Sequence, residues 1–304
     1  MENQRIEPTD APARRISSVV QQAARRLLSA GIDTGFLDAE VLLCHALGTT
    51  REQIVLTANG LLSDSELRAY EALISRRVAR EPTAYITGVR EFWSQSFHVA
   101  PGVLIPRPET ELLVEIALRL ALELGSTRPL RIVDIGTGSG AIAVALASEL
   151  AEAEIFAIDL SAAALEAAKG NASRNHVGGK IKFLRGDLLA PLQLNQQVDL
   201  IVSNPPYVRH DDIDRLEPEV RCWEPRSALD GGWDGLDYYR LILPEAFHYL
   251  RPNGALAVEI GASLGKAVAA LFKEVAGSAE VKIHHDYAGN ERVVTARKIL
   301  WAGP

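Results

Sequence analysis

The segment VSNPPYV, residues 202–208, places a carboxamide, two prolines and an aromatic ring at the end of an apolar run. Proline has no N–H, so Pro205 and Pro206 end a strand's hydrogen-bond ladder and leave acceptors without competing donors. We expect the Asn204 side-chain oxygen and the Asn204 and Pro205 carbonyls to receive the coplanar N–H groups of a carboxamide or a base amine. Tyr207 would form a flat wall beside them. A rigid turn with a packing tyrosine is the alternative interpretation.

A glycine-rich turn lies upstream, in DIGTGSGAIA at residues 134–143. Such a turn between a strand and a helix lets a ligand approach the backbone and the helix N-terminus. The spacing is Gly-x-Gly-x-Gly, which differs from a dinucleotide fingerprint, and no Gly-Lys-Ser/Thr follows to make a phosphate loop. The pattern predicts a nucleotide-like site at Gly136, Gly138 and Gly140. A glycine-rich turn whose only role is to pack the helix against the strand could have the same sequence.

Two aspartates follow at the ends of the next two predicted strands. Asp159 ends IFAID, where a carboxylate can accept both hydroxyls of a ribose. Its alternative role is a helix cap, although Ser161 could cap equally well. Asp187, with the apolar Leu188, could hold an adenine, whereas a turn-forming aspartate is the simpler interpretation. Together with the glycine turn, these strand ends fit one adenosine across the carboxyl edge of a sheet.

The elements that must position these residues begin after Pro129, where apolar strands alternate with helices. Continuous apolar strands separated by helices are typical of a parallel sheet covered on both faces, so the fold class is α/β. The segment from Val208 to Gly235 lacks clear periodicity and is rich in charge, Trp, Pro and Gly. A connection of that length is more often a lid or binding loop than filler.

The first 80 or so residues read differently, as amphipathic helices. Asp38 is a possible cap of the second helix, and Ser63 and Glu66 have the spacing of a capping box. Arginine pairs at 14–15, 25–26 and 76–77 indicate solvated helix faces or a docking face for a partner. The β-branched and aromatic residues that follow, around two glycines, predict a hairpin between two domains.

Composition excludes several classes of protein. The 304 residues are 47% hydrophobic, enough for two domains with at least one large core. No apolar stretch approaches the roughly 20 residues needed to cross a bilayer, and the N-terminus has no signal-peptide core, so we expect a cytoplasmic protein without membrane contact. The net charge of −7 argues against binding nucleic acid through phosphates. Two isolated cysteines and scattered histidines predict neither disulfides nor a metal site.

In combination, these motifs resemble the class I S-adenosylmethionine-dependent methyltransferases that methylate planar nitrogens. The segments REPTAYITGVREFW, LIPRPETELLVE, EPRSALDGGWDGL and DYAGNERVV narrow the resemblance to the PrmC (HemK) family. It implies a Rossmann-like, mainly parallel seven-stranded sheet and a small all-helical N-terminal domain joined to it by a β-hairpin. The implied ranges are 1–82 for a helical substrate-docking domain, 83–105 for the hairpin linker and 106–304 for the catalytic domain.

The resemblance also implies an activity, which is methylation of the side-chain nitrogen N5 of the glutamine in the GGQ motif of class 1 peptide chain release factors. The implied cofactor is S-adenosyl-L-methionine. It would be held by residues 136–140, Asp159, Asp187 and Leu188, with Asn204 touching both substrates. Leu188 stands where some family members carry an aromatic residue beside the adenine, which implies a weaker stacking contact here.

The catalytic residues implied by the family are Asn204, Pro205, Pro206 and Tyr207. A carboxamide nitrogen is a poor nucleophile because its lone pair is delocalised, so positioning must supply the catalysis. In the RPETE segment, Arg107, Glu109, Thr110 and Glu111 either contact the methionine end of the cofactor or only cap a helix and face solvent.

Other functions remain open at this point. An adenine amine presents the same two donors, so a DNA or RNA amino-methyltransferase is a rival, although the acidic charge argues against it. A methyltransferase acting on a ribosomal-protein glutamine is a closer rival, but IPRPETE and the N-terminal helices favour the release-factor group. A non-catalytic module that senses S-adenosylmethionine would have no need of an amide clamp, that is, of acceptors that hold the N–H groups of a substrate amide.

Overall fold

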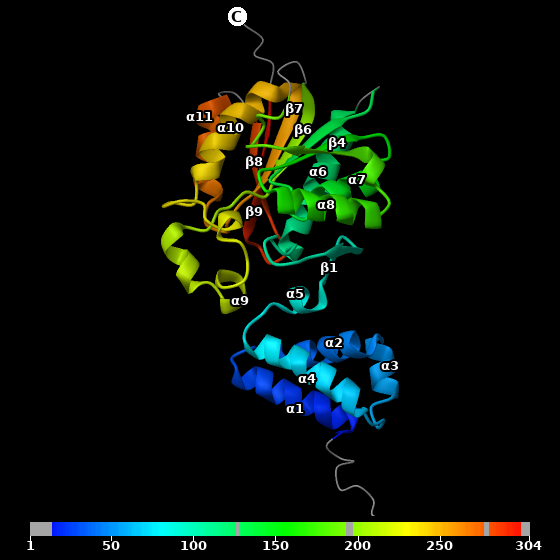
Figure 1. The fold of residues 1–304 in the computed structure, drawn as a ribbon. Helices are drawn as coiled ribbons and strands as arrows, with labels where there is room; N and C mark the ends of the chain where they lie inside the picture. The colour runs from blue at the N-terminus through cyan, green and yellow to red at the C-terminus, as the bar shows by residue number, and fades with distance from the viewer. Residues whose placement is uncertain (1–13, 126–127, 193–196, 277–279, 299–304) are drawn as a thin grey trace, which may run out of the picture. The chain divides into compact units, whose positions relative to one another are not determined.

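The computed structural model describes residues 14–125, 128–192, 197–276 and 280–298. The chain forms two compact units (Figure 1). The first comprises Met1–Gly88 together with Pro218–Trp223, and the second comprises Val89–Glu217 and Glu224–Pro304. The chain therefore leaves the second unit for six residues, joins the first and returns. No such return was predicted from the sequence.

The first unit is helical, as the sequence indicated. Its core is formed by apolar residues of the four longer helices and is completed by Ile86. The Ser63–Glu66 capping box is present, with the serine side chain accepting from the Glu66 N–H. The helices of residues 1–88 are α1 (Ile16–Ser29), α2 (Gly35–Leu47), α3 (Arg51–Leu56), α4 (Asp64–Val78) and α5 (Thr83–Thr87).

Two details of this unit differ from the predictions. Helix α2 begins at Gly35 with Thr34 as its cap residue, so the prediction of Asp38 as a cap was wrong. Asp38 is buried and pairs with Arg77 at 2.8 Å. Arg77 also donates to Glu219 at 2.8 Å, which ties the returning segment into the unit. A buried arginine with two carboxylate partners cannot offer its guanidinium to another protein, so Arg77 is not part of a docking face.

The second unit contains a strand pair and a seven-stranded sheet. The pair is shorter than the predicted hairpin range, because Thr83–Thr87 is helical. The sheet order is β5-β4-β3-β6-β7-β9-β8, parallel except for β9, which runs antiparallel to both its neighbours. The strands are β1 (Val89–Phe92), β2 (Gln95–His98), β3 (Arg131–Ile135), β4 (Glu154–Asp159), β5 (Ile181–Arg185), β6 (Val198–Ser203), β7 (Leu250–Glu259), β8 (Glu280–His285) and β9 (Glu291–Arg297).

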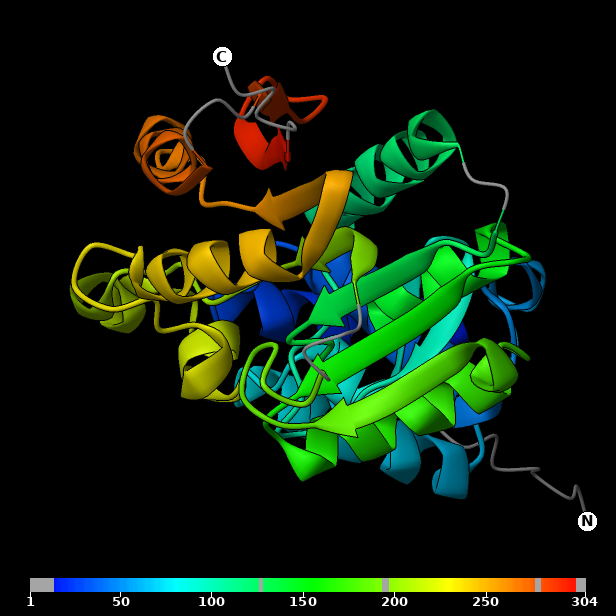
Figure 2. The same cartoon turned by 90° about the horizontal axis from the view of Figure 1, so that it is seen from above.

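Helices cover both faces of this sheet (Figure 2). Side chains alternate along each strand, so Ile132 and Leu200 join one apolar cluster while Val133 and Ile201 join the other. One cluster packs α6 and α7 against the sheet, and the other packs α10 and α11. The longer helices of the unit are α6 (Glu111–Leu124), α7 (Ala141–Glu149), α8 (Ala162–Arg174), α10 (Asp237–Tyr249) and α11 (Gly265–Ala276). Within the described ranges, no helix is long and apolar enough to span a bilayer.

The connection from Val208 to Gly235 is not structureless. It contains the short helices η4 (His210–Arg215), α9 (Pro218–Arg221) and η5 (Arg226–Ala228), of which α9 belongs to the first unit. Two further 3-10 turns lie elsewhere, η2 (Pro108–Thr110) and η3 (Gly178–Lys180). The connection bends back on itself, because Val208 and Asp230 form an isolated parallel bridge.

Candidate active site

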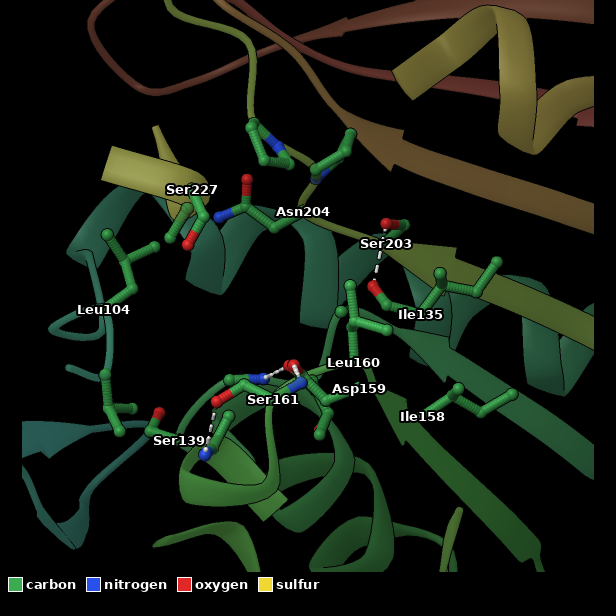
Figure 3. A pocket seen from close by; sticks show the side chains of 18 of the residues that line it. Leu104, Ile135, Ser139, Ile158, Asp159, Leu160, Ser161, Ser203, Asn204 and Ser227 are labelled. Carbon is green, nitrogen blue, oxygen red and sulfur yellow. Dashed lines mark hydrogen bonds between the residues drawn. The ribbon is translucent and has the colours of Figure 1, made fainter. Parts of the chain in front are cut away.

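A pocket of about 390 Å³ lies in the second unit at the carboxyl ends of β3, β4 and β6 (Figure 3). Asn204 and Asp159 line it from two different strand ends. This edge of a parallel sheet is where ligands bind in open α/β folds. Of the predicted site residues, those that line the pocket are Gly136, Thr137, Gly138, Ser139, Asp159, Asp187, Leu188, Asn204, Pro205 and Pro206. Gly140 and Tyr207 are not among the lining residues.

The glycine turn forms the floor that joins β3 to α7. All three of its glycines have positive φ, between 56° and 82°, a backbone conformation that residues with a Cβ rarely adopt. Gly140 is the N-terminal cap residue of α7, and a Cβ there would stand 3.0 Å from Ala168. Gly140 therefore allows the turn to pack closely against α8, and its contact with a cofactor stays a prediction.

Asp159 ties the turn to the end of β4. One carboxylate oxygen accepts from the Gly138 N–H at 2.9 Å, and the other accepts from the Ser161 N–H at 2.8 Å (Figure 3). Ser161 is the residue that caps α8, through its hydroxyl and the Ala164 N–H. Asp159 is thus free of the capping role and faces the pocket with a fixed orientation, as a carboxylate that accepts ribose hydroxyls would need.

Asp187 and Leu188 line the pocket beyond the end of β5, as does Tyr238 of α10. Leu188 has a φ of 44°, in the left-handed region that residues other than glycine rarely occupy. Backbone strain of this kind concentrates at functional sites. Burial and the nearby Asp187 charge raise the pKa of the Tyr238 hydroxyl, which stays protonated at neutral pH. The sequence analysis did not single out Tyr238.

Asn204 is held by a residue far away in sequence. Its side-chain nitrogen donates to the Thr110 hydroxyl at 3.1 Å. Of the RPETE residues, Thr110 and Arg107 line the pocket, whereas Glu111 accepts from the Trp93 N–H at 2.8 Å and holds the β1–β2 pair. Because the amide nitrogen is engaged, the amide oxygen of Asn204 remains available at the pocket wall.

Tyr207 is half-buried, and its hydroxyl lies 3.3 Å from the Glu259 carboxyl. Glu259 ends β7 and is 1% exposed. Burial raises the pKa of this carboxyl to about 7, although hydrogen bonds from Thr110 and Tyr207 and the charge of Arg292 act in the opposite direction. Burial also raises the pKa of Tyr207. A polar residue at the end of an apolar strand was the sequence signal for Glu259, and it was missed.

A second buried carboxyl joins two walls of the pocket. Glu224 accepts from the Ile105 N–H at 3.1 Å and pairs with the Arg107 guanidinium. Glu224 thereby connects the segment that contains Leu104 with the loop that contains Ser227. Both of these residues line the pocket (Figure 3). Burial raises the pKa of Glu224 despite the nearby arginine. Among the residues with defined positions, no group of three or more His, Cys, Asp or Glu side chains could hold a metal ion.

Family models match both parts of the chain. The PrmC N-terminal domain matches residues 18–88, and the methyltransferase small domain matches residues 110–217. A release factor glutamine methyltransferase from Nitratidesulfovibrio vulgaris is 40% identical over 97% of this chain and 99% of its own length. The chain belongs to the release factor glutamine methyltransferases. A family member from Geobacter sulfurreducens is 42% identical over 93% of this chain and 96% of its own.

The resemblance to the PrmC family that was inferred from the motifs is therefore confirmed. The prediction that the protein is a methyltransferase is confirmed as well. A solved methyltransferase from Pyrococcus furiosus, 18% identical, superposes with a TM-score of 0.50 over 77% of this chain and 98% of its own. At that identity the likeness shows the fold alone. With the sheet order described above, it confirms the class I methyltransferase fold that the sequence predicted. Release factor glutamine methyltransferases thus share a fold with other methyltransferases, and the fold by itself does not identify their substrate.

Proposed function

We propose that this enzyme methylates N5 of the glutamine in the GGQ motif of class 1 release factors, with S-adenosylmethionine as methyl donor. The observation that carries the proposal is the Asn204 amide, whose nitrogen is engaged by Thr110 so that its oxygen can accept an N–H of a substrate carboxamide. The names of the relatives support the release factor as substrate.

The pocket fits the methyl donor. Its volume lies within the usual range for small-molecule sites, roughly 300–1,000 Å³. The glycine turn offers backbone close to the ligand, and Asp159 is oriented toward the place of a ribose. Bound there, S-adenosylmethionine supplies an electrophilic methyl group. Asp187 and Leu188, beyond the next strand, complete a site for the adenine.

The enzyme's own residues then act by positioning. The Asn204 side-chain oxygen and the Pro205 carbonyl accept the two N–H groups of the glutamine and turn its nitrogen toward the methyl group. The same acceptors stabilise the positive charge that the nitrogen gains. No strong general base is needed, because a methylated amide nitrogen loses its proton readily. Tyr207 does not use its hydroxyl to bind the substrate, because that hydroxyl donates to Glu259. It contributes by holding the backbone of the Asn-Pro-Pro-Tyr segment in place.

Selectivity for release factors requires more than the clamp, which fits any carboxamide. The helical unit docks the release factor at a distance from its GGQ loop and so raises the local concentration of that loop at the site. Arg25 of α1 is exposed and remains a candidate contact, whereas Arg26 pairs with Glu71 and Arg76 pairs with Glu81. A substrate that acts in translation implies the cytoplasm as the place of action.

The test is methyl transfer from labelled S-adenosylmethionine to three acceptors, namely an intact class 1 release factor, a ribosomal protein and a DNA duplex. The control is the same release factor with the GGQ glutamine replaced by alanine. The proposal requires label on the intact factor and its absence from the control, with the methyl group located on the glutamine by peptide mass spectrometry. Preferential labelling of the ribosomal protein or of DNA would overturn it.

A further inference from the structure

The backbone of the Asn-Pro-Pro-Tyr segment is packed against glycines of a later loop, residues 230–235 (DGGWDG). A Cβ placed on Gly231 would lie 2.7 Å from the Tyr207 Cα and 2.8 Å from the Pro206 carbonyl oxygen. A Cβ on Gly235 would lie 2.6 Å from the Tyr207 carbonyl oxygen. Carbon atoms in ordinary contact are about 3.5–4.0 Å apart. The two segments therefore lie so close together that a side chain does not fit between them.

Gly231 and Gly235 require the absence of a side chain for different reasons. Gly235 has a φ of 77°, so its backbone conformation alone favours glycine. The φ of Gly231 lies outside the left-handed region. At Gly231 the reason is the close approach of another backbone, which is one of the positions where glycine is needed within a chain.

Hydrogen bonds keep the two segments together. The Val208 N–H donates to the Leu229 carbonyl at 2.9 Å, and the Gly231 N–H donates to the Val208 carbonyl at 2.8 Å. The Gly231 carbonyl in turn accepts from the Asp237 N–H, at the start of α10, at 3.1 Å. The segments cannot separate to admit a side chain at Gly231 unless these bonds break.

The Tyr207 side chain is fixed on its other side. Its hydroxyl donates to Glu259 at 3.3 Å, and a Cβ on Gly261 would lie 3.3 Å from the edge of its ring. Between Tyr207 and Asn204 stand two prolines, whose rings fix φ and restrict the residue before each of them. A displacement of the Tyr207 backbone is therefore passed on to Asn204 and is not absorbed by the chain.

We propose that Gly231 is a positioning residue for methyl transfer, because its missing side chain lets the 230–235 segment hold the substrate-binding acceptors of Asn204 and Pro205 in place. This inference rests on the proposed function. The carbonyl oxygen of Pro206 lies against Gly231, so the acceptors available to a substrate amide lie before it in the segment. The DGGWDG sequence thereby acts on the reaction through the backbone of the Asn-Pro-Pro-Tyr segment.

The first test compares Gly231→Ala with the wild type. The added Cβ must displace the backbone, and a misplacement of about 1 Å can cost a hundredfold in rate, so we expect kcat to fall about ten- to a hundredfold. KM for the release factor and the affinity for S-adenosylmethionine should stay near wild type, because Gly231 is not among the residues that line the pocket. A purely structural role would lower thermal stability and leave the kcat of the folded enzyme unchanged.

Gly179→Ala is the matched control. Gly179, in η3, also has φ outside the left-handed region, and a Cβ there has no atom of the described residues within 4 Å, its chain neighbours apart. It should behave as wild type. Gly261→Ala is a milder second variant, because its Cβ would press only on the edge of the Tyr207 ring. We expect its kcat to lie between those of the wild type and Gly231→Ala.

A readout independent of catalysis follows Tyr207 itself. In protein labelled with 3-fluorotyrosine, the ¹⁹F signal of Tyr207 is assigned by its loss in Tyr207→Phe. This signal should shift in Gly231→Ala and Gly261→Ala and stay in place in Gly179→Ala. The shift should be present without substrate, because the packing of the two segments does not depend on one.

A Gly231→Ala protein that binds S-adenosylmethionine and keeps the wild-type kcat would overturn the proposal, as would an unmoved Tyr207 signal in that protein. If Gly231→Ala fails to bind S-adenosylmethionine, Gly261→Ala decides, and a normal kcat with an unmoved signal would then overturn the proposal. Absence of methyl transfer by the wild type would refute the proposed function instead. The Tyr207 signal would then decide by itself whether Gly231 positions the segment.

Discussion

The Asn204 amide and the Thr110 hydroxyl lie 3.1 Å apart although 94 residues separate them in the chain. This contact unites two motifs that looked independent in the sequence, the Asn-Pro-Pro-Tyr segment and the RPETE segment. It also explains why an asparagine rather than another amide acceptor stands at the end of β6. Its short side chain can bond Thr110 with one edge and still offer the other edge to a ligand.

Replacing Asn204 by alanine should reduce the methylation rate by roughly a hundredfold or more, by analogy with removing one oriented polar group from a transition state. Affinity for S-adenosylmethionine should change much less, because the glycine turn and Asp159 are intact. Single-turnover transfer and calorimetric titration measure the two effects. Asn175→Ala, which removes a half-buried amide that donates to the Ser96 and Asn171 carbonyls, is the control and should behave as wild type. Near-normal transfer by Asn204→Ala would exclude the amide clamp.

Asp159→Asn should weaken S-adenosylmethionine binding about ten- to a hundredfold, because it removes the charge from hydrogen bonds worth about 1.5–3 kcal/mol. Asparagine is preferable to alanine here, since its amide oxygen can still accept from the Gly138 N–H, although the Ser161 N–H loses its acceptor. Titration calorimetry checks the affinity. Ser161→Ala removes only the α8 cap and should lower thermal stability with little change in affinity. The ribose contact would be disproved by a folded Asp159→Asn protein that binds as tightly as wild type.

Glu219→Ala should lower the free energy of unfolding by roughly 1–3 kcal/mol, because it removes a carboxylate that pairs with the buried Arg77 and with Arg80. Burial raises the pKa of Glu219, but the bonds from Arg80 and Arg77 outweigh it and leave that pKa below the ordinary value. The measurement is denaturant unfolding at neutral pH. Glu219→Gln keeps the shape and part of the hydrogen bonding, so its loss should be smaller. Equal stability of all three proteins would mean that the Pro218–Trp223 segment contributes no stability to the first unit.

The stability of the fold should depend on pH through Glu259. Its pKa is about 7 in the native state against an ordinary value of 4.5, so the native state holds this proton more tightly than the unfolded chain. The stabilisation is therefore complete below about pH 4.5 and is lost as the pH rises through 7, a change of about 3 kcal/mol. Glu259→Gln should lack this loss. Its stability relative to wild type should rise by that amount between pH 4.5 and 8, and parallel curves would contradict the assignment.

Arg25→Glu should raise KM for an intact release factor severalfold and leave KM for a short GGQ peptide unchanged, because the peptide reaches only the catalytic site. Steady-state kinetics with both substrates separate the two effects. Arg174→Glu on α8, an arginine of the second unit that is also exposed, is the matched control. This comparison is cleaner than deletion of residues 1–80, which would also strip Glu219 of both arginines. If Arg25→Glu behaves like the control with both substrates, Arg25 makes no docking contact.

The sequence by itself determined the features that depend on neighbours along the chain. Glycines at i, i+2 and i+4 after an apolar strand required a tight turn, and two prolines after Asn204 required the strand to end. The Ser63–Glu66 capping box was equally readable, since its bonds span three residues. The alternation of apolar strands with helices indicated a parallel sheet, whose carboxyl edge then gathers the strand ends on one side.

Only the tertiary structure decided which distant side chains meet. Asp38 had a credible local role as a cap, but burial beside α4 made it the partner of Arg77. Glu259 looked like one more polar residue at a strand end until the parallel pairing of β6 with β7 brought it to Tyr207. Such contacts depend on the order of strands in the sheet and on which segments of the chain return to an earlier unit. Neither feature produces a periodic pattern in the sequence from which it could be predicted. The role of a buried carboxyl that has no partner nearby in the sequence can be inferred only when the tertiary structure shows which distant residue it bonds.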